Sequence, residues 1–274
     1  PDDLLILCHH GVSPRWPTEF AIAPDTLERQ VRFLLGRGYE PLTLAAALAP
    51  GAPSKALVVT FDDAYRSVLS EGFPVLKRLG APATVFVPTA FPRPGKPMAW
   101  AGMERWLGTR FEAELEPMSW DELRHLGEAG WEVGSHSRGH RDLVALSDDE
   151  LTEELRGSRA DCENEIGRPC VSLAYPFSSY DERVKRVARE AGYQAAVILD
   201  SELAVPRGSV SFAAGGPDPH ELLRAGIYRH DGWARFRFKV SPRARRIRAS
   251  RSLHRAMQIG SRRVNALSGR REQR

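Results

Sequence analysis

Two carboxylates stand side by side at the end of an apolar run. Residues 57–61 include four apolar and three β-branched side chains, a pattern typical of a buried strand, and Asp62 and Asp63 follow directly. Because adjacent buried carboxylates repel each other, the pair indicates a nearby cation, and a divalent metal ion is the commonest choice. The alternative is a turn in which Asp62 or Asp63 caps the next helix.

A pair of histidines, His136 and His140, ends a second short strand that begins at Trp131. On a helical turn, positions i and i+4 share one face, so both imidazoles could reach one ion. Two imidazole nitrogens and one carboxylate are a common ligand set for zinc. A His pair at this spacing is often accidental, but together with the Asp pair it predicts a metal site.

The elements that must position these residues alternate between strands and helices. Apolar runs predict strands at 4–8, 39–42, 57–61, 83–87, from 131, 171–175 and 194–199. Helical periodicity and capping signals predict helices at 25–35, 43–48, 68–79, 119–130, 147–166, 182–191 and 219–227. Capping boxes are expected at Asp25 and Ser147. Residues 88–117 are rich in Pro, Gly and Trp and indicate an insertion or a lid.

Such alternation indicates a parallel α/β sheet or barrel, in which the chemistry lies at the carboxyl ends of the strands. Four predicted strand ends carry polar or unusual residues: His9 and His10, Asp62 and Asp63, His136 and His140, and the stretch 175–177. The sequence therefore predicts one functional rim.

Three motifs resemble those of the polysaccharide deacetylases of the NodB-homology type, carbohydrate esterase family 4. They are Thr60-Phe61-Asp62-Asp63-Ala64-Tyr65, His136-Ser137-x-x-His140 and Ala174-Tyr175-Pro176-Phe177. The resemblance covers roughly residues 4–200. It implies a distorted (β/α)7 barrel, expected over residues 1–230, and metal-dependent removal of acetyl groups from N-acetylated sugars.

The resemblance also implies residue roles. Asp63, His136 and His140 would hold Zn²⁺ or another divalent transition metal, and Asp62 would be the general base. Because the late L-x-H motif of many relatives is not evident, His10, in His9-His10-Gly11-Val12, is expected to be the general acid. The alternative for His10 is a histidine that merely ends the strand.

The third motif implies a substrate pocket formed by Tyr175, Pro176 and Phe177, with the backbone N–H of Phe177 at the oxyanion. The alternative is an aromatic strand end that packs into the core. Ala174 stands where many relatives have an arginine paired with the base, and Arg207 is a candidate replacement or, equally, a surface residue.

Two substitutions at turns also depart from the family pattern. Ala64 replaces a glycine and is expected only to restrain the backbone, whereas Ser178 replaces another and puts the turn after the third motif in doubt.

Charge is distributed unevenly along the 274 residues. Residues 235–274 contain 14 Lys and Arg and one acid, which leaves 25 basic and 34 acidic residues in the rest of the chain. Residues 231–274 are therefore expected to form a basic tail, partly helical or disordered, that contacts an anionic membrane surface or a partner. Nucleic acid is the less favoured partner, because the tail carries a weak apolar stripe.

Compartment signals are sparse. The three cysteines do not form an even disulfide framework, and residues 1–4 show no secretory signal pattern. We therefore expect a cytoplasmic protein that works at the inner membrane face.

Two other functions stay open at this point. One is a deformylase or another C–N amide hydrolase that acts on a small molecule, which a closed pocket under residues 88–117 would favour. The other is a non-catalytic carbohydrate-binding relative, favoured by Ala174 and the missing late histidine, and disfavoured by the intact Asp and His pairs.

Overall fold

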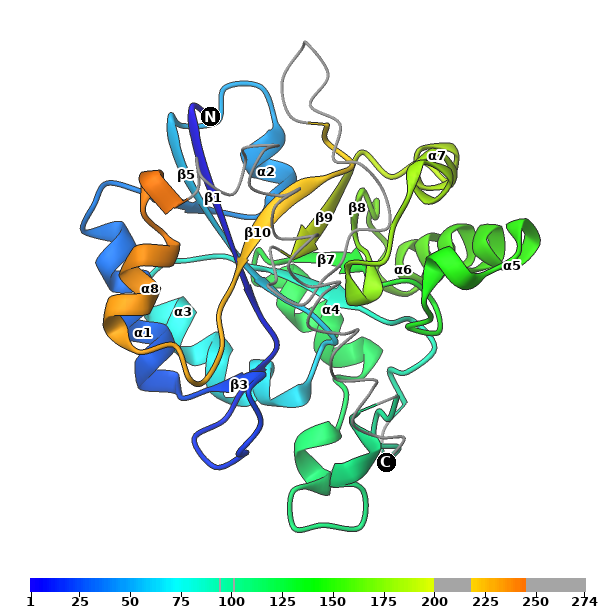
Figure 1. Ribbon diagram of the computed structural model, residues 1–274, viewed down its shortest axis with the longest axis horizontal. Helices are drawn as coiled ribbons and strands as arrows, with labels where there is room; N and C mark the ends of the chain where they lie inside the picture. The colour runs from blue at the N-terminus through cyan, green and yellow to red at the C-terminus, as the bar shows by residue number, and fades with distance from the viewer. Residues whose placement is uncertain (94, 101, 200–217, 245–274) are drawn as a thin grey trace, which may run out of the picture.

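A closed ring of parallel strands lies at the centre of the computed structural model, which describes residues 1–93, 95–100, 102–199 and 218–244 (Figure 1). Neighbours in the ring follow the order β1, β10, β9, β8, β7, β6 and β5, and β1 pairs with β5 to close it. The strand bounds are β1 Asp3–His9, β5 Lys55–Phe61, β6 Thr84–Val87, β7 Glu132–Ser135, β8 Ser172–Ala174, β9 Ala195–Leu199 and β10 Leu222–Gly226. The predicted distorted (β/α)7 barrel is therefore confirmed.

Three short strands lie beside the ring. β4, Glu40–Leu42, pairs with residues 56–58 of β5, while β2, Gly11–Val12, and β3, Ala21–Ile22, pair only with each other. The last two belong to the loop that leaves β1.

Helices surround the strands (Figure 1). Their bounds are α1 Pro24–Leu35, α2 Leu44–Leu48, α3 Phe73–Arg78, α4 Trp120–Glu128, α5 Asp148–Thr152, α6 Ser158–Ile166, α7 Glu182–Glu190 and α8 Trp233–Lys239. The π-helical turns η1, Val68–Gly72, and η5, Glu153–Gly157, lead into α3 and join α5 to α6. The 3₁₀ turns are η2 Glu104–Trp106, η3 Glu112–Leu115, η4 Leu143–Ala145 and η6 Pro176–Ser178.

Alternation along the strands separates an inner from an outer core. In β5, Ala56 and Val58 belong to a buried cluster inside the ring with Phe86, whereas Leu57 and Val59 pack in the cluster toward the helices. Both faces are buried, which explains the nearly continuous apolar run in the sequence. Because side chains alternate with period two, the residues that continue the inner row past the strand end face the mouth of the barrel.

The predicted helix at 219–227 is wrong, because residues 222–226 form β10. This strand pairs with β9 through Leu222 and Leu223 and with β1 through Ala225 and Gly226. β1 and β9 need a partner strand between them to satisfy their backbone hydrogen bonds and close the ring. This requirement outweighs the helical pattern of the residues in the segment.

Helix starts were predicted with mixed success. Ser147 forms the expected capping box with Glu150, and the helix expected to start at Ser119 has a capping box with Glu122 that was not predicted. At the first helix the capping box is wrong, since Pro24 occupies the first turn and the N-cap is Ala23, whose side chain has no oxygen to accept a hydrogen bond.

The final described helix packs on the barrel. Phe236 of α8 is fully buried and its ring lies 6.1 Å from that of Phe33 in α1. The predicted domain division at 230/231 and the membrane-binding tail stay predictions, because residues 245–274 lie outside the described part. Across the described ranges, no helix has both the length and the apolar character needed to cross a membrane.

Candidate active site

The functional rim is built where β1, β5, β7 and β8 end. Asp62 and Asp63 follow β5, His136 follows β7, and His10 follows β1. The backbone N–H of His136 donates to Val87 of the neighbouring strand, so the loop leaves the barrel in register. The structure thus brings the predicted strand ends to one side of the barrel.

Asp63, His136 and His140 converge. One donor atom from each lies within 4.8 Å of the other two, and all three residues are buried. Oδ1 of Asp63 is 3.3 Å from Nε2 of His140 and 3.6 Å from Nε2 of His136. The structure therefore assembles the predicted ligand set.

The backbone reaches this geometry through left-handed residues. Among the described residues, those other than glycine with positive φ lie in the three motifs or directly after the third: Asp63, Ala64, Ser137, His140, Phe177 and Ser178. Such conformations cost about 1–2 kcal/mol per residue and tend to mark functional sites. The expectation that His136 and His140 share a helical turn is wrong, because a bend with φ of 61° at Ser137 and 53° at His140 aims both rings at Asp63.

Buried oxygen atoms hold that bend. The Oε2 atom of Glu154, on η5, accepts the backbone N–H groups of Arg138 at 2.9 Å and Gly139 at 2.8 Å. Ser137 Oγ accepts the backbone N–H of His140. Glu154 is only 8% exposed, and a π-helical turn at such a place is a recurrent feature of functional sites. The carboxylate therefore fixes the two residues that separate Ser137 from His140.

A backbone carbonyl orients His136. Its Nδ1 lies 2.8 Å from the carbonyl oxygen of Ala174, a contact that requires a proton on Nδ1 and leaves the Nε2 lone pair toward the carboxylates. Burial lowers the pKa of His136 to about 4, so the ring is neutral at pH 7, the form that binds a metal.

Asp62 is held by an arginine that the sequence analysis missed. Arg224 of β10 donates from Nη1 and Nη2 to the two carboxylate oxygens at 2.6 and 2.7 Å, and also to Thr60 Oγ1 at 3.0 Å. Burial by itself would raise the pKa of Asp62, but the guanidinium holds this pKa well below its usual range. Asp62 is therefore ionised and paired with Arg224, and it does not cap a helix.

The arginine predicted for this task, Arg207, lies outside the described residues. Arg224 makes the contact with Asp62 for which Ala174 has no side chain, and it does so from β10, which β9 separates from the β8 strand of Ala174. A sequence signal existed in Leu222-Leu223-Arg224-Ala225-Gly226, a short strand with one charge among apolar residues, but the helix assignment concealed it.

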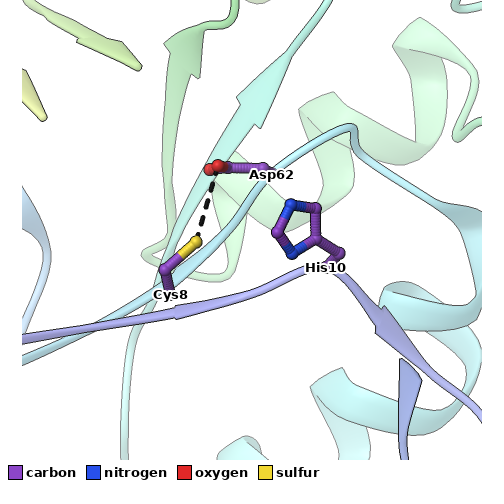
Figure 2. A group of neighbouring side chains, drawn as sticks. All are labelled: Cys8, His10 and Asp62. Carbon is purple, nitrogen blue, oxygen red and sulfur yellow. Dashed lines mark hydrogen bonds between the residues drawn. The ribbon is translucent and has the colours of Figure 1, made fainter. Parts of the chain in front are cut away.

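His10 and Cys8 share the inner row of β1 and lie beside Asp62. Figure 2 shows both side chains pointing from β1 toward the carboxylate, and Cys8 Sγ donates to Asp62 Oδ2 at 3.5 Å. His10 is half-buried, whereas His9 is buried on the opposite face against Phe61. Burial raises the pKa of Cys8 well above its usual value, so the thiol is protonated in the metal-free chain.

The third motif divides between core and rim. Tyr175 is buried between strands and helices, stacks on Tyr180 and donates its hydroxyl to the carbonyl of His220, so the predicted pocket role gives way to the core-packing alternative. Pro176 is buried and starts the 3₁₀ turn η6. Phe177 is 52% exposed with its ring 4.7 Å from that of His140.

Ser178 resolves the doubt about the turn that follows. It adopts a φ of 50°, and its Oγ accepts the backbone N–H of Leu199 at 2.7 Å. A glycine could not make this bond, so the serine couples the third motif to the end of β9.

The predicted insertion places an aromatic ring over the candidate site. Trp100 stacks on His140 with a centroid distance of 4.1 Å and an interplanar angle of 20°. Met98, Met103 and Leu115 of the same segment pack with Tyr65 and anchor it to the rim. Trp100 and Phe177 thus flank His140 with apolar surface.

The residues at this centre fit a divalent cation. Asp63 Oδ1 and His140 Nδ1 are buried and accept or donate no hydrogen bond within the described part of the chain. A buried carboxylate oxygen without a partner is costly, and a cation between it and two neutral imidazoles removes that cost. The donor set of two nitrogens and one oxygen suits Zn²⁺ and similar ions.

Comparison with known proteins gives a family match. Residues 49–196 match the family model described as "Polysaccharide deacetylase". YxkH of Bacillus subtilis (strain 168) is 24% identical over 205 residues, which cover 73% of this chain and 66% of that protein. The poly-beta-1,6-N-acetyl-D-glucosamine N-deacetylase of Staphylococcus aureus (strain MRSA252) is 20% identical over 203 residues, 69% of this chain and 65% of that protein. The chain therefore spans just under two thirds of the length of these curated relatives.

A solved structure supports the fold. The crystal structure of BC0361, a polysaccharide deacetylase from Bacillus cereus, superposes with a TM-score of 0.68 over 87% of this chain and 69% of that chain, at 21% identity. At this identity the likeness extends to the barrel and not to the chemistry.

Proposed function

The chain belongs to the polysaccharide deacetylase family, and from this premise we propose that it hydrolyses the acetamido groups of N-acetylated sugars with the help of a divalent metal ion. The observation that supports this proposal best is the convergence of Asp63, His136 and His140 beside an Asp62 that Arg224 keeps ionised. Three side chains that can bind a cation thus lie beside one carboxylate, that of Asp62, which is not part of the ligand set.

Asp63, His136 and His140 would hold the ion. When bound, it would supply Lewis acidity, which polarises a carbonyl group and makes water acidic enough to attack at neutral pH. The hydrogen bond from His136 Nδ1 to Ala174 keeps the Nε2 lone pair directed inward for this purpose.

Asp62 would act as the general base. Its Oδ2 lies 3.9 Å from His136 Nε2, so the carboxylate borders the ligand set without belonging to it. In that position it can accept a proton from the water that attacks the acetyl carbon. The bidentate contact with Arg224 fixes the orientation of the carboxylate and favours its ionised form.

His10 would act as the general acid. It lies on the side of Asp62 that faces β1, and its ring is half-buried (Figure 2). A protonated imidazole there can donate to the sugar nitrogen as the C–N bond breaks, which lets the amine leave uncharged.

The substrate class follows from the rim and from one relative. Phe177 and Trp100 offer apolar faces on which a pyranose ring can pack. The Staphylococcus aureus relative is named for poly-β-1,6-N-acetyl-D-glucosamine. We therefore take a β-linked N-acetylglucosamine polymer as the first substrate to test.

The test measures acetate released by the zinc-loaded protein from a panel of β-1,6- and β-1,4-linked N-acetylglucosamine oligomers and small N-formyl amides. Release of acetate from an oligomer supports the proposal. In the Asp62→Asn variant we expect turnover to fall by about 10²–10⁴-fold, the usual contribution of a general base, while zinc content stays the same. Full activity of the variant would refute the role of Asp62, and release of formate alone would favour the small-molecule amide hydrolase.

A further inference from the structure

A second group of metal-binding side chains lies beside the first. Cys8, His10 and Asp62 each place one donor atom within 4.8 Å of the other two, and none of them is a member of the set formed by Asp63, His136 and His140. Figure 2 shows the thiol and the imidazole approaching the carboxylate from β1 and from the residue that follows it. The group therefore offers one sulfur, one nitrogen and one oxygen donor.

Strand pairing holds this group together. β1 and β5 are in parallel register along their length, with Cys8 opposite Thr60, and the backbone N–H of Asp62 donates to the carbonyl of His9 at 2.9 Å. Cys8 in β1 and His10, directly after this strand, are two positions apart, so both point to the inner row. The three donors thus come from rigid, adjacent strand ends.

The donor atoms are available to a ligand. His10 Nδ1 is buried and has no hydrogen-bond partner in the described ranges, and the Cys8 thiol makes only long contacts, at 3.5 Å to Asp62 and 3.7 Å to the His9 carbonyl. Arg224 uses one lone pair on each oxygen of Asp62, and a carboxylate has about four lone-pair sites. A lone pair of Asp62 therefore remains on the side of Cys8.

Charge and size fit a soft dication. With the thiol deprotonated, Cys8 and Asp62 carry two negative charges against the single positive charge of Arg224. Tetrahedral zinc with bonds of about 2.0–2.3 Å places its ligands roughly 3.3–3.8 Å apart. Cys8 Sγ and Asp62 Oδ2 already meet this spacing at 3.5 Å, and the His10 donor, which lies within 4.8 Å of both residues' donor atoms, must approach by about 1.5 Å at most.

We infer that Cys8, His10 and Asp62 form a second cation site, selective for soft divalent ions such as Cd²⁺ and Zn²⁺ over Mg²⁺ and Ca²⁺. Thiolate and imidazole ligands favour such ions, whereas oxygen-only ligands favour Mg²⁺ and Ca²⁺. On binding, the S–H bond of Cys8 breaks, a sulfur–metal bond forms, and the proton passes to solvent. No electron is transferred.

Occupation of this site inhibits hydrolysis, because the ion engages the base Asp62 and the acid His10 together. The inhibition rests on the proposed function, whereas the binding does not. A spectroscopic measurement can therefore test the site even if the substrate assignment fails.

The experiment titrates metal-free protein with CdCl₂ and records the ultraviolet thiolate-to-cadmium charge-transfer band. The Asp63, His136 and His140 set contains no sulfur and gives no such band. Cys162 and Cys170 are also buried, so the Cys162→Ser/Cys170→Ser variant, which keeps Cys8 as the one thiol of the chain, is compared with the cysteine-free triple variant. We expect a saturable band of one equivalent in the first protein and none in the second.

Three single variants make the result decisive if the double variant folds poorly. In the otherwise unchanged chain, Cys8→Ser should raise the Cd²⁺ dissociation constant measured by the band at least ~10-fold, the lower end of the cost of losing even an outer-shell partner. His10→Gln should also weaken it, whereas Cys162→Ser should not. A band of equal size in the parent chain and in Cys8→Ser, or no band in the protein that keeps Cys8 alone, would overturn the inference.

An activity arm links the site to catalysis. Cd²⁺ added to zinc-loaded protein should slow acetate release in the parent chain, and Cys8→Ser should shift the half-inhibitory concentration upward by the same factor as the dissociation constant. Equal inhibition of both proteins, with the band confirmed, would place the inhibitory ion at Asp63 instead and refute the inhibitory role of the second site.

Discussion

Replacing Arg224 with methionine tests the electrostatic core of the candidate site. The substitution keeps most of the side-chain volume but removes the guanidinium that contacts both oxygens of Asp62 at 2.6 and 2.7 Å. Arg224 is 1% and Asp62 2% exposed, so little solvent can replace the lost partner. Removing one member of a buried pair costs about 3–5 kcal/mol. For an ordered chain of this size, each kcal/mol corresponds to roughly 2–4 °C, and the melting temperature should fall by about 6–20 °C.

The pH dependence gives the sign of the effect. Because the pKa of Asp62 in the folded protein lies below its ordinary value of 3.8, the pair contributes its stability above that value and loses it as the pH falls through the folded pKa. The variant should therefore be most destabilised near neutral pH and approach the parent protein in acid. Its kcat/KM profile should show an acidic limb moved to higher pH, because Asp62 then titrates at a raised pKa.

The assay is denaturant unfolding of the metal-free proteins from pH 3 to pH 8, with kcat/KM of the zinc-loaded proteins over the range in which both stay folded. Arg224→Lys is the matched control, because it keeps one charge but not the bidentate contact and should fall between the two. Asp62→Asn combined with Arg224→Met should lose less stability than the two single changes added together. An Arg224→Met protein with unchanged stability and an unchanged acidic limb would refute the argument.

Two other substitutions test the surroundings of the ligand set. Glu154→Ala should weaken zinc binding by about 10–100-fold, because two backbone N–H groups of the His136–His140 bend lose their acceptor. Glu154→Gln keeps an acceptor oxygen and should recover most of the affinity. Zinc affinity is measured by competition with a chelating dye, and Glu153→Ala, at an exposed neighbouring position, is the control. Equal affinities for all four proteins would contradict this. Trp100→Ala should raise KM for an N-acetylglucosamine oligomer more than it lowers kcat, since the ring covers His140 but holds no reacting group; a pure kcat loss with unchanged KM would instead indicate that Trp100 positions His140.

The barrel could be predicted because its strands are buried on both faces. Runs such as 57–61 are apolar without interruption, and the helices between them carry recognisable caps at Ser119 and Ser147. The last strand, β10, was not predicted, because its pairing with neighbouring strands, and not its own residue types, determines its structure. In β10 an arginine and a glycine occupy inner positions that only a closed ring can use.

The ligand set could be predicted from residue types but not from local geometry. The spacing of His136 and His140 suggested a helix, yet the residues meet through left-handed backbone that Glu154 and Ser137 stabilise from outside the motif. The pairing of Asp62 with Arg224 joins positions 162 residues apart, and no periodicity in the chain reports such a contact. Tyr175 shows the opposite case, a motif residue whose side chain turns into the core.

The central claim is that one cation binds between Asp63, His136 and His140 while Asp62 stays paired with Arg224. A crystal structure of the zinc-loaded protein, with anomalous diffraction measured on both sides of the zinc edge, tests it most directly. We predict a peak about 2.0–2.2 Å from one Asp63 oxygen and from a ring nitrogen of each histidine. Zinc bound at full occupancy elsewhere, with these three side chains bearing no peak, would contradict the account.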